Sequence, residues 1–146
     1  MKNLRLTPEN SQSIALELNK LLSSYQIHYQ NLRGFHWNIT GRKFFELHLK
    51  FEELYNEALL RIDEIAERIL TLGHKPLHTF QDYIAVSTIT AKKGTLNGQE
   101  SVEATLAAFE ALLQLEYDLL AKSADAEDEG TNAMMSDYIK QNEKMR

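Results

Sequence analysis

Apolar residues recur every three or four positions along two long stretches of the chain, and the two prolines, Pro8 and Pro76, interrupt neither. This spacing places apolar side chains on one side of an α-helix. The first stretch predicts a helix at about residues 10–38. The second predicts a helix that begins near Phe44 and ends at Leu72, before a glycine at the position where helices commonly stop.

The helical pattern continues after a long connection that begins at Pro76. Three further helices are predicted: a short one at residues 80–89, a long one from Val102 to the acidic turn before Gly130, and a last one from Asn132 to about Lys144. Four amphipathic helices with one extended crossover are typical of ferritin-like bundles. We therefore predict an all-α, ferritin-like four-helix bundle, formed by a single domain over residues 1–146.

Composition narrows the class of protein and the chemistry of any site. Hydrophobic residues make up 43% and charged residues 25% of the 146 positions, which is typical of a globular domain and not of a disordered chain. An apolar run long enough to cross a membrane and a signal peptide are both missing, so we expect a soluble, cytoplasmic protein. Because cysteine is also missing, any metal would be bound by the five histidines and the carboxylates.

The balance of charge disfavours a polyanionic partner. Sixteen basic and 21 acidic residues leave a formal net charge of −5, and the few basic residues near the two ends form no block of like charge. Neutralising phosphates with lysine and arginine is the main source of affinity for DNA. We therefore expect direct DNA binding to be weak or absent.

Four residues of the second predicted helix have side chains that commonly bind metal ions. His48 and Glu52 are four positions apart, and so are Asp63 and Glu67, so each pair shares a face of the helix. Eleven residues separate the two pairs, from Glu52 to Asp63, which corresponds to ~16 Å along the helix axis. One helix therefore cannot bring all four side chains to one metal ion.

The positions of these residues are symmetric about one point of the helix, next to Glu57. A second copy of the helix, antiparallel to the first and related to it by a two-fold axis at this point, would place His48 opposite the partner's Glu67. Glu52 would then face the partner's Asp63. The pattern predicts two identical metal sites per dimer, each shared between two subunits.

His36, at the end of the first helix and beside Trp37, is a candidate for an additional nitrogen ligand. Imidazole with carboxylate suits iron, manganese or zinc, and carboxylate-rich sites of four-helix bundles bind iron in pairs. The alternative is that these residues only belong to a solvated helix surface, on which Arg61 and Glu64 would indicate an exposed charged face.

Residues 31–73 resemble the signature region of the Dps family, the starvation-type mini-ferritins. The resemblance comprises His36-Trp37, Leu47-His48, the sequence FEELY at 51–55 and the sequence DEIAER at 63–68. The segments 80–89 and 128–144 also resemble the short crossover helix and the last helix of that family. The resemblance therefore extends over nearly the whole chain.

This resemblance implies a hollow dodecamer that oxidises ferrous iron between two-fold-related subunits. The ligands that it implies are His36, His48 and Glu52 of one subunit and Asp63 and Glu67 of the other. The oxidant would be hydrogen peroxide in preference to dioxygen, and ferric oxide would be stored in the cavity, which protects against oxidative damage. Other divalent metals could also bind.

Trp37 matches a tryptophan of that family that intercepts oxidant radicals, and Tyr29 is a weaker candidate for the same role. The alternative for both residues is that they only pack in the core. The other histidines, His28, His74 and His78, are expected at the surface or in turns. An acidic cluster is either the solvated end of the third helix or, as the resemblance implies, part of a cation-attracting pore. It consists of Asp125, Glu127, Asp128 and Glu129.

Two other classes of function remain open from the sequence. One is a nucleoid-protecting DNA-binding protein that does not need the iron chemistry. The other is a purely structural helical bundle in which the metal ligands have lost their role.

Overall fold

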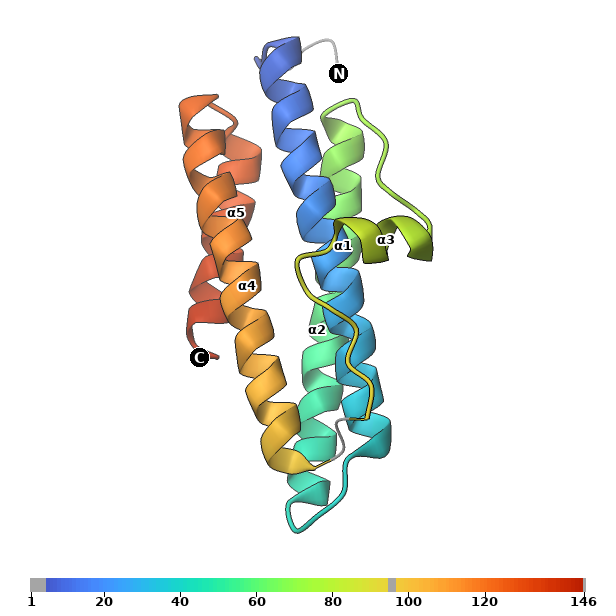
Figure 1. Cartoon of the computed structure of the whole chain (residues 1–146). Helices are drawn as coiled ribbons and strands as arrows, with labels where there is room; N and C mark the ends of the chain where they lie inside the picture. Colours follow the sequence, from blue (N-terminus) through green and yellow to red (C-terminus); the bar gives the residue numbers. More distant parts are fainter. Residues whose placement is uncertain (1–4, 95–96, 146) are drawn as a thin grey trace.

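The computed structural model describes residues 5–94 and 97–145, and in this part of the chain it is all-helical. The helices are α1 (Pro8–Asn38), α2 (Phe44–Thr71), α3 (Phe80–Val86), α4 (Gly98–Asp125) and α5 (Glu129–Glu143). The predicted four-helix bundle with a short crossover helix is confirmed (Figure 1). None of the described helices is both long and apolar enough to cross a membrane.

Two antiparallel helix pairs form the bundle. α1 packs along α2 and α4 along α5, while α1 also contacts α4 and joins the two pairs (Figure 1). The connection between α2 and α4 runs along the outside of the bundle, and α3 packs there against α1. Because this connection runs along the length of the bundle, α2 and α4 point in the same direction (Figure 1). This is the topology of a bundle with one long crossover.

Side-chain caps set the helix boundaries. Thr7 accepts a hydrogen bond from the Asn10 amide at the start of α1, and Asp128 accepts one from the Thr131 amide at the start of α5. Because Asp128 is the cap, α5 begins three residues before the predicted start at Asn132. α3 ends at Val86 and not at residue 89, because Ser87 is extended and its hydroxyl bonds the backbone two residues further on.

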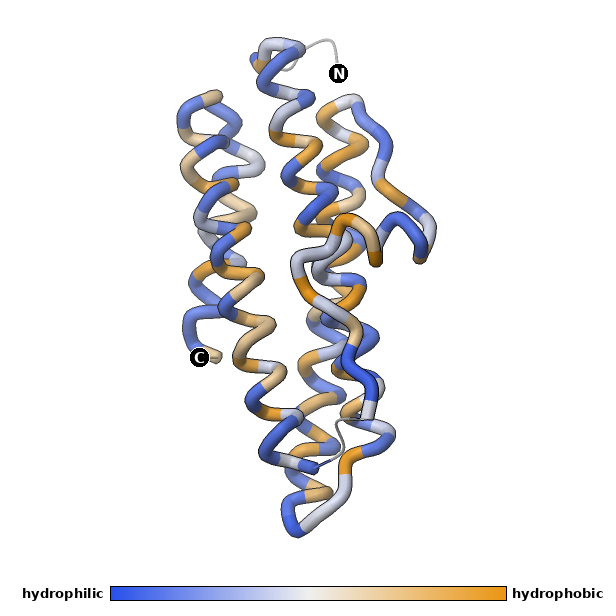
Figure 2. The backbone as a smooth tube through the Cα atoms, viewed as in Figure 1, coloured by the Kyte–Doolittle hydropathy of each residue, from blue (hydrophilic) through white to orange (hydrophobic). Residues whose placement is uncertain are grey.

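The core lies along the inner sides of the four long helices. Leucine and isoleucine make up most of the buried hydrophobic residues, and hydrophobic segments, in orange, recur along the helices in Figure 2. The buried residues of α1 and α2 include Leu18, Leu32 and Ile65, and those of α4 include Leu112 and Leu119. Burying a side chain of this size contributes roughly 1.5–3 kcal/mol, so this core is the main source of the bundle's stability.

A polar cluster interrupts the core near its middle. Arg61 of α2 is only 4% exposed, so its interpretation as part of an exposed charged face is wrong. Its guanidinium donates hydrogen bonds to the Tyr25 hydroxyl at 3.0 Å and to the side-chain amide oxygen of Asn142 at 2.6 Å. It also forms an ion pair with Glu57. The fully buried Glu116 accepts from Tyr25 at 2.7 Å. Burial raises the pKa of Glu116 to about 7, although these hydrogen bonds and Arg61 act in the opposite direction.

His28 lies in the same region and is buried, so its predicted surface position is wrong. Its ring packs edge-on against Phe109 and Tyr25, with ring centroids 5.1 Å and 6.2 Å away. Burial, assisted by the charge of Arg61, lowers the pKa of His28 to about 3. The folded protein therefore holds this imidazole neutral over a wide range of pH.

His28 should make the protein sensitive to acid. An unfolded histidine binds a proton below its usual pKa of about 6.5 and the folded His28 does not, so the stability contribution is complete above about pH 6.5 and is lost as the pH falls toward 3. Between pH 7 and pH 5 we expect the wild type to lose about 2 kcal/mol more than His28→Leu, measured by urea unfolding. Parallel pH profiles of the two proteins would contradict this assignment.

Candidate metal centre

His36 and His48 form a close pair across the turn between α1 and α2. Their rings stack with centroids 3.7 Å apart and planes inclined by 15°. The Nδ1 atom of each ring lies 2.7 Å from the backbone carbonyl oxygen of the other residue. Because a carbonyl oxygen only accepts, both Nδ1 atoms carry a proton, which leaves Nε2 as the nitrogen of each ring that can bind a metal. Fixing the tautomer through the second nitrogen is how proteins prepare histidine ligands for a metal.

The three carboxylates follow on α2. Glu52 is one turn beyond His48 and half-buried, whereas Asp63 and Glu67 are exposed further along the helix. The pKa of Glu67 is raised, because its carboxyl hydrogen-bonds to Asp63 and lies beside the charge of that group. Two carboxylates in such proximity repel each other unless a proton or a cation lies between them.

The described part of the chain brings its potential metal ligands together only in pairs. Among the described residues, no three histidine, aspartate or glutamate side chains come together in a way that could hold one metal ion. His36 and His48 form one pair, and Asp63 and Glu67 form another. Any site with more ligands would need side chains from outside this chain.

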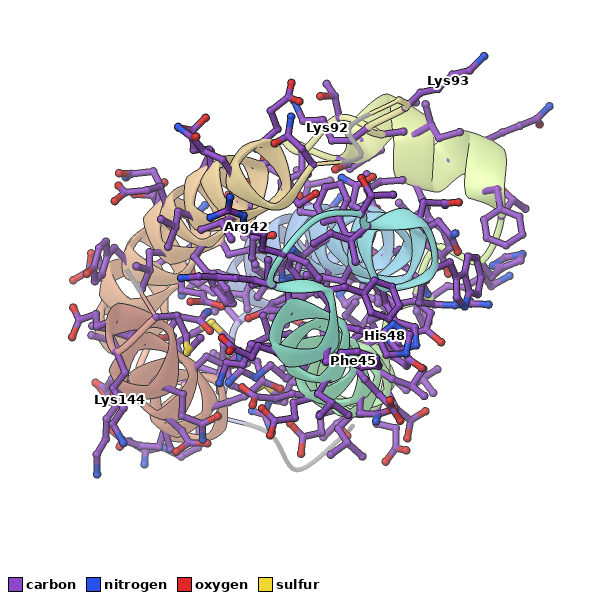
Figure 3. All side chains as sticks on the ribbon, turned by 90° about the horizontal axis from the view of Figure 1, so that it is seen from below. Arg42, Phe45, His48, Lys92, Lys93 and Lys144 are labelled. Carbon is purple, nitrogen blue, oxygen red and sulfur yellow. The ribbon has the colours of Figure 1, made fainter. Side chains whose placement is uncertain are left out.

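The carboxylates lie on the same side of α2 as a row of exposed apolar residues. At 100° per residue, this side covers about a third of the helix circumference, opposite the buried residues Phe51 and Ile65. The apolar members are Phe45, Leu49, Leu59, Leu60 and Leu70, which we call the α2 stripe. Phe45 is 78% and Leu60 is 66% exposed. Figure 3 shows Phe45 and His48 on the part of α2 that is turned away from Lys144 of α5.

A continuous exposed apolar face is typical of a protein interface. The α2 stripe lies between and around the three carboxylates, so a partner that covers the apolar residues would also approach Glu52, Asp63 and Glu67. Three carboxylates that could bind a metal therefore lie on an exposed apolar side of α2.

Trp37 is 56% exposed, so the alternative of core packing is wrong for this residue. The guanidinium of Arg33 lies 4.8 Å from the centroid of Trp37 and 5.1 Å from that of Tyr29, between the two rings. Tyr29 in turn packs against Tyr55, and Tyr55 against His36, with centroid distances of 6.0 Å and 5.3 Å. A row of aromatic rings therefore leads from the histidine pair toward the surface.

The contact of Tyr55 with His36 was not predicted from the sequence. The signal was present, because Tyr55 follows His48 by seven residues, which is two helical turns and therefore the same side of α2.

The acidic cluster divides into residues of different kinds. Asp128 is buried and forms an ion pair with Arg68 at 2.6 Å, so it stabilises the bundle and is not solvated. Glu127 is exposed and pairs with Arg5 at 2.9 Å. The remaining members, Asp125 and Glu129, are exposed and can contribute to the electrostatic field of the surface.

The remaining histidines lie in and near the turn that follows α2. His74 is half-buried and contacts the Ser11 hydroxyl at 3.2 Å. His78 is exposed, and its Nδ1 lies 3.1 Å from the Pro76 carbonyl oxygen. Both positions agree with the prediction of turn or surface histidines.

Comparisons with known proteins define the class. A family model for the ferritin-like domain matches residues 15–146. An uncharacterised Haemophilus influenzae protein is 44% identical over 143 residues, which cover 98% of this chain and 89% of that protein. DNA protection during starvation protein 2 of Bacillus anthracis is 36% identical over 126 residues, which cover 86% of each chain.

Solved structures agree with these relatives. The Dps protein of Vibrio cholerae O1, described as a member of a broad superfamily of ferritin-like diiron-carboxylate proteins, matches with a TM-score of 0.94 and 46% identity, over 96% of this chain and 88% of that one. A Dps protein of Bacillus brevis matches with a TM-score of 0.92 and 32% identity, over 96% and 94%. The fold and these matches define a ferritin-like protein. Within this class, the chain belongs to the Dps family, as the resemblance predicted.

Proposed function

We propose that this protein is a ferroxidase and iron-storage mini-ferritin whose metal sites form between two subunits. Two copies would pack their α2 helices antiparallel along the α2 stripe. Each site would then combine His36, His48 and Glu52 of one subunit with the partner's Asp63 and Glu67. The observation that carries this proposal is the position of the three carboxylates on the exposed apolar side of α2.

The donor set suits the oxidation of ferrous iron, which is the substrate. Imidazole nitrogens and carboxylate oxygens both bind Fe²⁺, and the negative charge of the carboxylates favours the trivalent product. Hydrogen peroxide accepts two electrons, one from each of two ferrous ions, and with two protons it gives two molecules of water. Because both electrons are delivered at one site, no hydroxyl radical is released. We expect dioxygen to react more slowly.

Trp37 would reduce oxidant radicals beside the proposed metal site. It follows His36 directly in the sequence, and its ring is exposed, so that oxidants which leave the proposed metal site can react with it. Transfer of one electron from the indole to a hydroxyl radical would give hydroxide and leave an indole radical on the protein. Tyr29 is a weaker candidate for the same role, since it reaches Trp37 only through Arg33.

The assembled state would be a dodecamer that stores ferric oxide in its cavity, in the cytoplasm. Its role would be protection against oxidative damage together with iron homeostasis. Exposed acidic side chains such as Asp125 and Glu129 would attract cations toward the shell. Other divalent metals that accept imidazole and carboxylate ligands, zinc and manganese among them, would compete for the same sites.

The reaction can be tested by mixing anaerobic Fe²⁺ with the protein and then adding peroxide. We expect two Fe²⁺ to be oxidised per peroxide, the ferric product to remain with the protein during gel filtration, and little hydroxyl radical to be caught by a spin trap. A stoichiometry and a radical yield equal to those of a protein-free solution would overturn the proposal. A low-salt gel shift with DNA examines the alternative: retardation by the protein alone would favour direct DNA binding.

A further inference from the structure

A second group of potential metal ligands lies inside the bundle, apart from the proposed intersubunit site. All four long helices contribute to it: Tyr25 and His28 from α1, Arg61 from α2, Glu116 from α4 and Asn142 from α5, with the exposed Glu57 of α2 at its edge. In ferritin-like di-iron proteins, inward carboxylates and histidines of the four helices bind metal in the bundle core. The interior group has the same residue types but fewer of them, with one buried carboxylate, Glu116, and one buried imidazole, His28, and it also contains the cation of Arg61.

The guanidinium of Arg61 lies where these side chains converge. It donates to the Tyr25 hydroxyl and the Asn142 carbonyl, and it pairs with Glu57. The Asn142 amide in turn donates to both oxygens of Glu116, at 2.9 Å and 3.1 Å. The oxygens that could bind a cation are therefore already occupied by hydrogen bonds around one organic cation.

Charge and space both oppose a metal in the presence of Arg61. Two positive charges in a region of low dielectric constant repel each other strongly, and Glu116, the fully buried carboxylate of this group, already accepts hydrogen bonds from Tyr25 and Asn142. The cavity beside Arg61, lined also by His28 and Phe109, has a volume of about 10 Å³. That volume accommodates about one water molecule, but not a metal with additional ligands.

We propose that Arg61 takes the place of a metal ion in the bundle interior and excludes divalent cations from the donor set of Tyr25, His28 and Glu116. If the proposed function holds, this exclusion confines iron to the boundary between subunits, so that iron is oxidised only in assembled protein. Arg61 is then the residue that decides where in the fold metal binds.

The test measures Co²⁺ binding to the full-length protein, by visible absorption and native mass spectrometry. All variants carry Asp63→Asn, which weakens the proposed intersubunit site, so the interior is observed independently of the proposed function. Arg61→Met removes the charge and the planar guanidinium that fills the space between these side chains, and its unbranched, flexible side chain can turn away from them. We expect it to bind one additional Co²⁺ per subunit, at least tenfold more tightly than the parent. Arg61→Lys, which keeps the positive charge, should bind no additional Co²⁺.

The additional cobalt should disappear when Glu116→Gln is combined with Arg61→Met. Unchanged binding by a folded Arg61→Met protein, or cobalt that survives the loss of Glu116, would overturn the proposal. If Arg61→Met does not fold, as judged by circular dichroism, Arg61→Gln replaces it, because the amide can still bond to Tyr25 and Asn142. Glu116→Gln with Arg61 intact gives a separate check: a decrease in Co²⁺ binding would show that the interior already holds metal.

Discussion

Replacement of Asp63 by alanine is expected to slow the oxidation of Fe²⁺ by at least about 10–100-fold, the range typical for a lost interaction around a bound metal. Asp63 is exposed in the single chain and does not belong to the buried core, so the bundle should remain folded without it. The loss would affect both sites of a dimer, because each site takes Asp63 from one of the two subunits. Stopped-flow absorbance of the ferric product after addition of peroxide measures the rate.

A matched control is Asp137→Ala on α5. Asp137 is also an exposed aspartate, but it accepts a hydrogen bond from Gln141 on its own helix and is distant in sequence from the proposed ligands. We expect this variant to oxidise iron at the wild-type rate. Equal rates for Asp63→Ala and the wild type would remove Asp63 from the site and favour a purely structural bundle.

The second large effect concerns stability. Glu116→Leu removes the buried carboxylate whose charge acts on Arg61, although Arg61 keeps its ion pair with Glu57, and the loss of this member of the buried network should cost about 3–5 kcal/mol. Tyr25 and Asn142 would lose their acceptor at the same time. Urea unfolding of the wild type and the variant measures the difference.

A double variant separates the buried charge from the loss of packing. Glu116→Leu combined with Arg61→Met replaces both charges by apolar groups, and such replacements of buried ion pairs are often nearly neutral. We expect the double variant to be more stable than Glu116→Leu alone. If the two single losses instead add up in the double variant, Arg61 and Glu116 are not coupled, and the description of the polar cluster is wrong.

The helices could be predicted from the sequence because their apolar residues are regularly spaced. The same method failed for Arg61 and His28, since it assigns charged and polar residues to the outside. Their positions carried a signal nevertheless: Arg61 is four residues before the buried Ile65, and His28 is four residues before the buried Leu32. Neither residue has its hydrogen-bond or ring partners nearby in the sequence, so the folded bundle was needed to identify them.

The ligand pairs on α2 could also be recognised from spacing, but not the surface around them. Leu49 and Leu60 look like ordinary helix residues until the fold shows that nothing in the described chain covers them. The stacking of His36 on His48 depends on the turn between two helices and has no simple sequence signal. The proposed site would also need a second subunit, which the sequence indicates only through the symmetric positions of its ligand pairs.

The central claim is that one metal site takes its ligands from two chains, and mixing two inactive variants tests this most directly. In a mixed dimer of His48→Ala and Asp63→Ala, one site would carry both substitutions and the other site neither. Random reassembly of equal amounts, after reversible dissociation, should therefore restore about a quarter of the wild-type Fe²⁺ oxidation, although each variant alone stays inactive. If mixed dimers form, as native mass spectrometry can verify, and no activity returns, the ligands do not come from two subunits and the proposed site is contradicted.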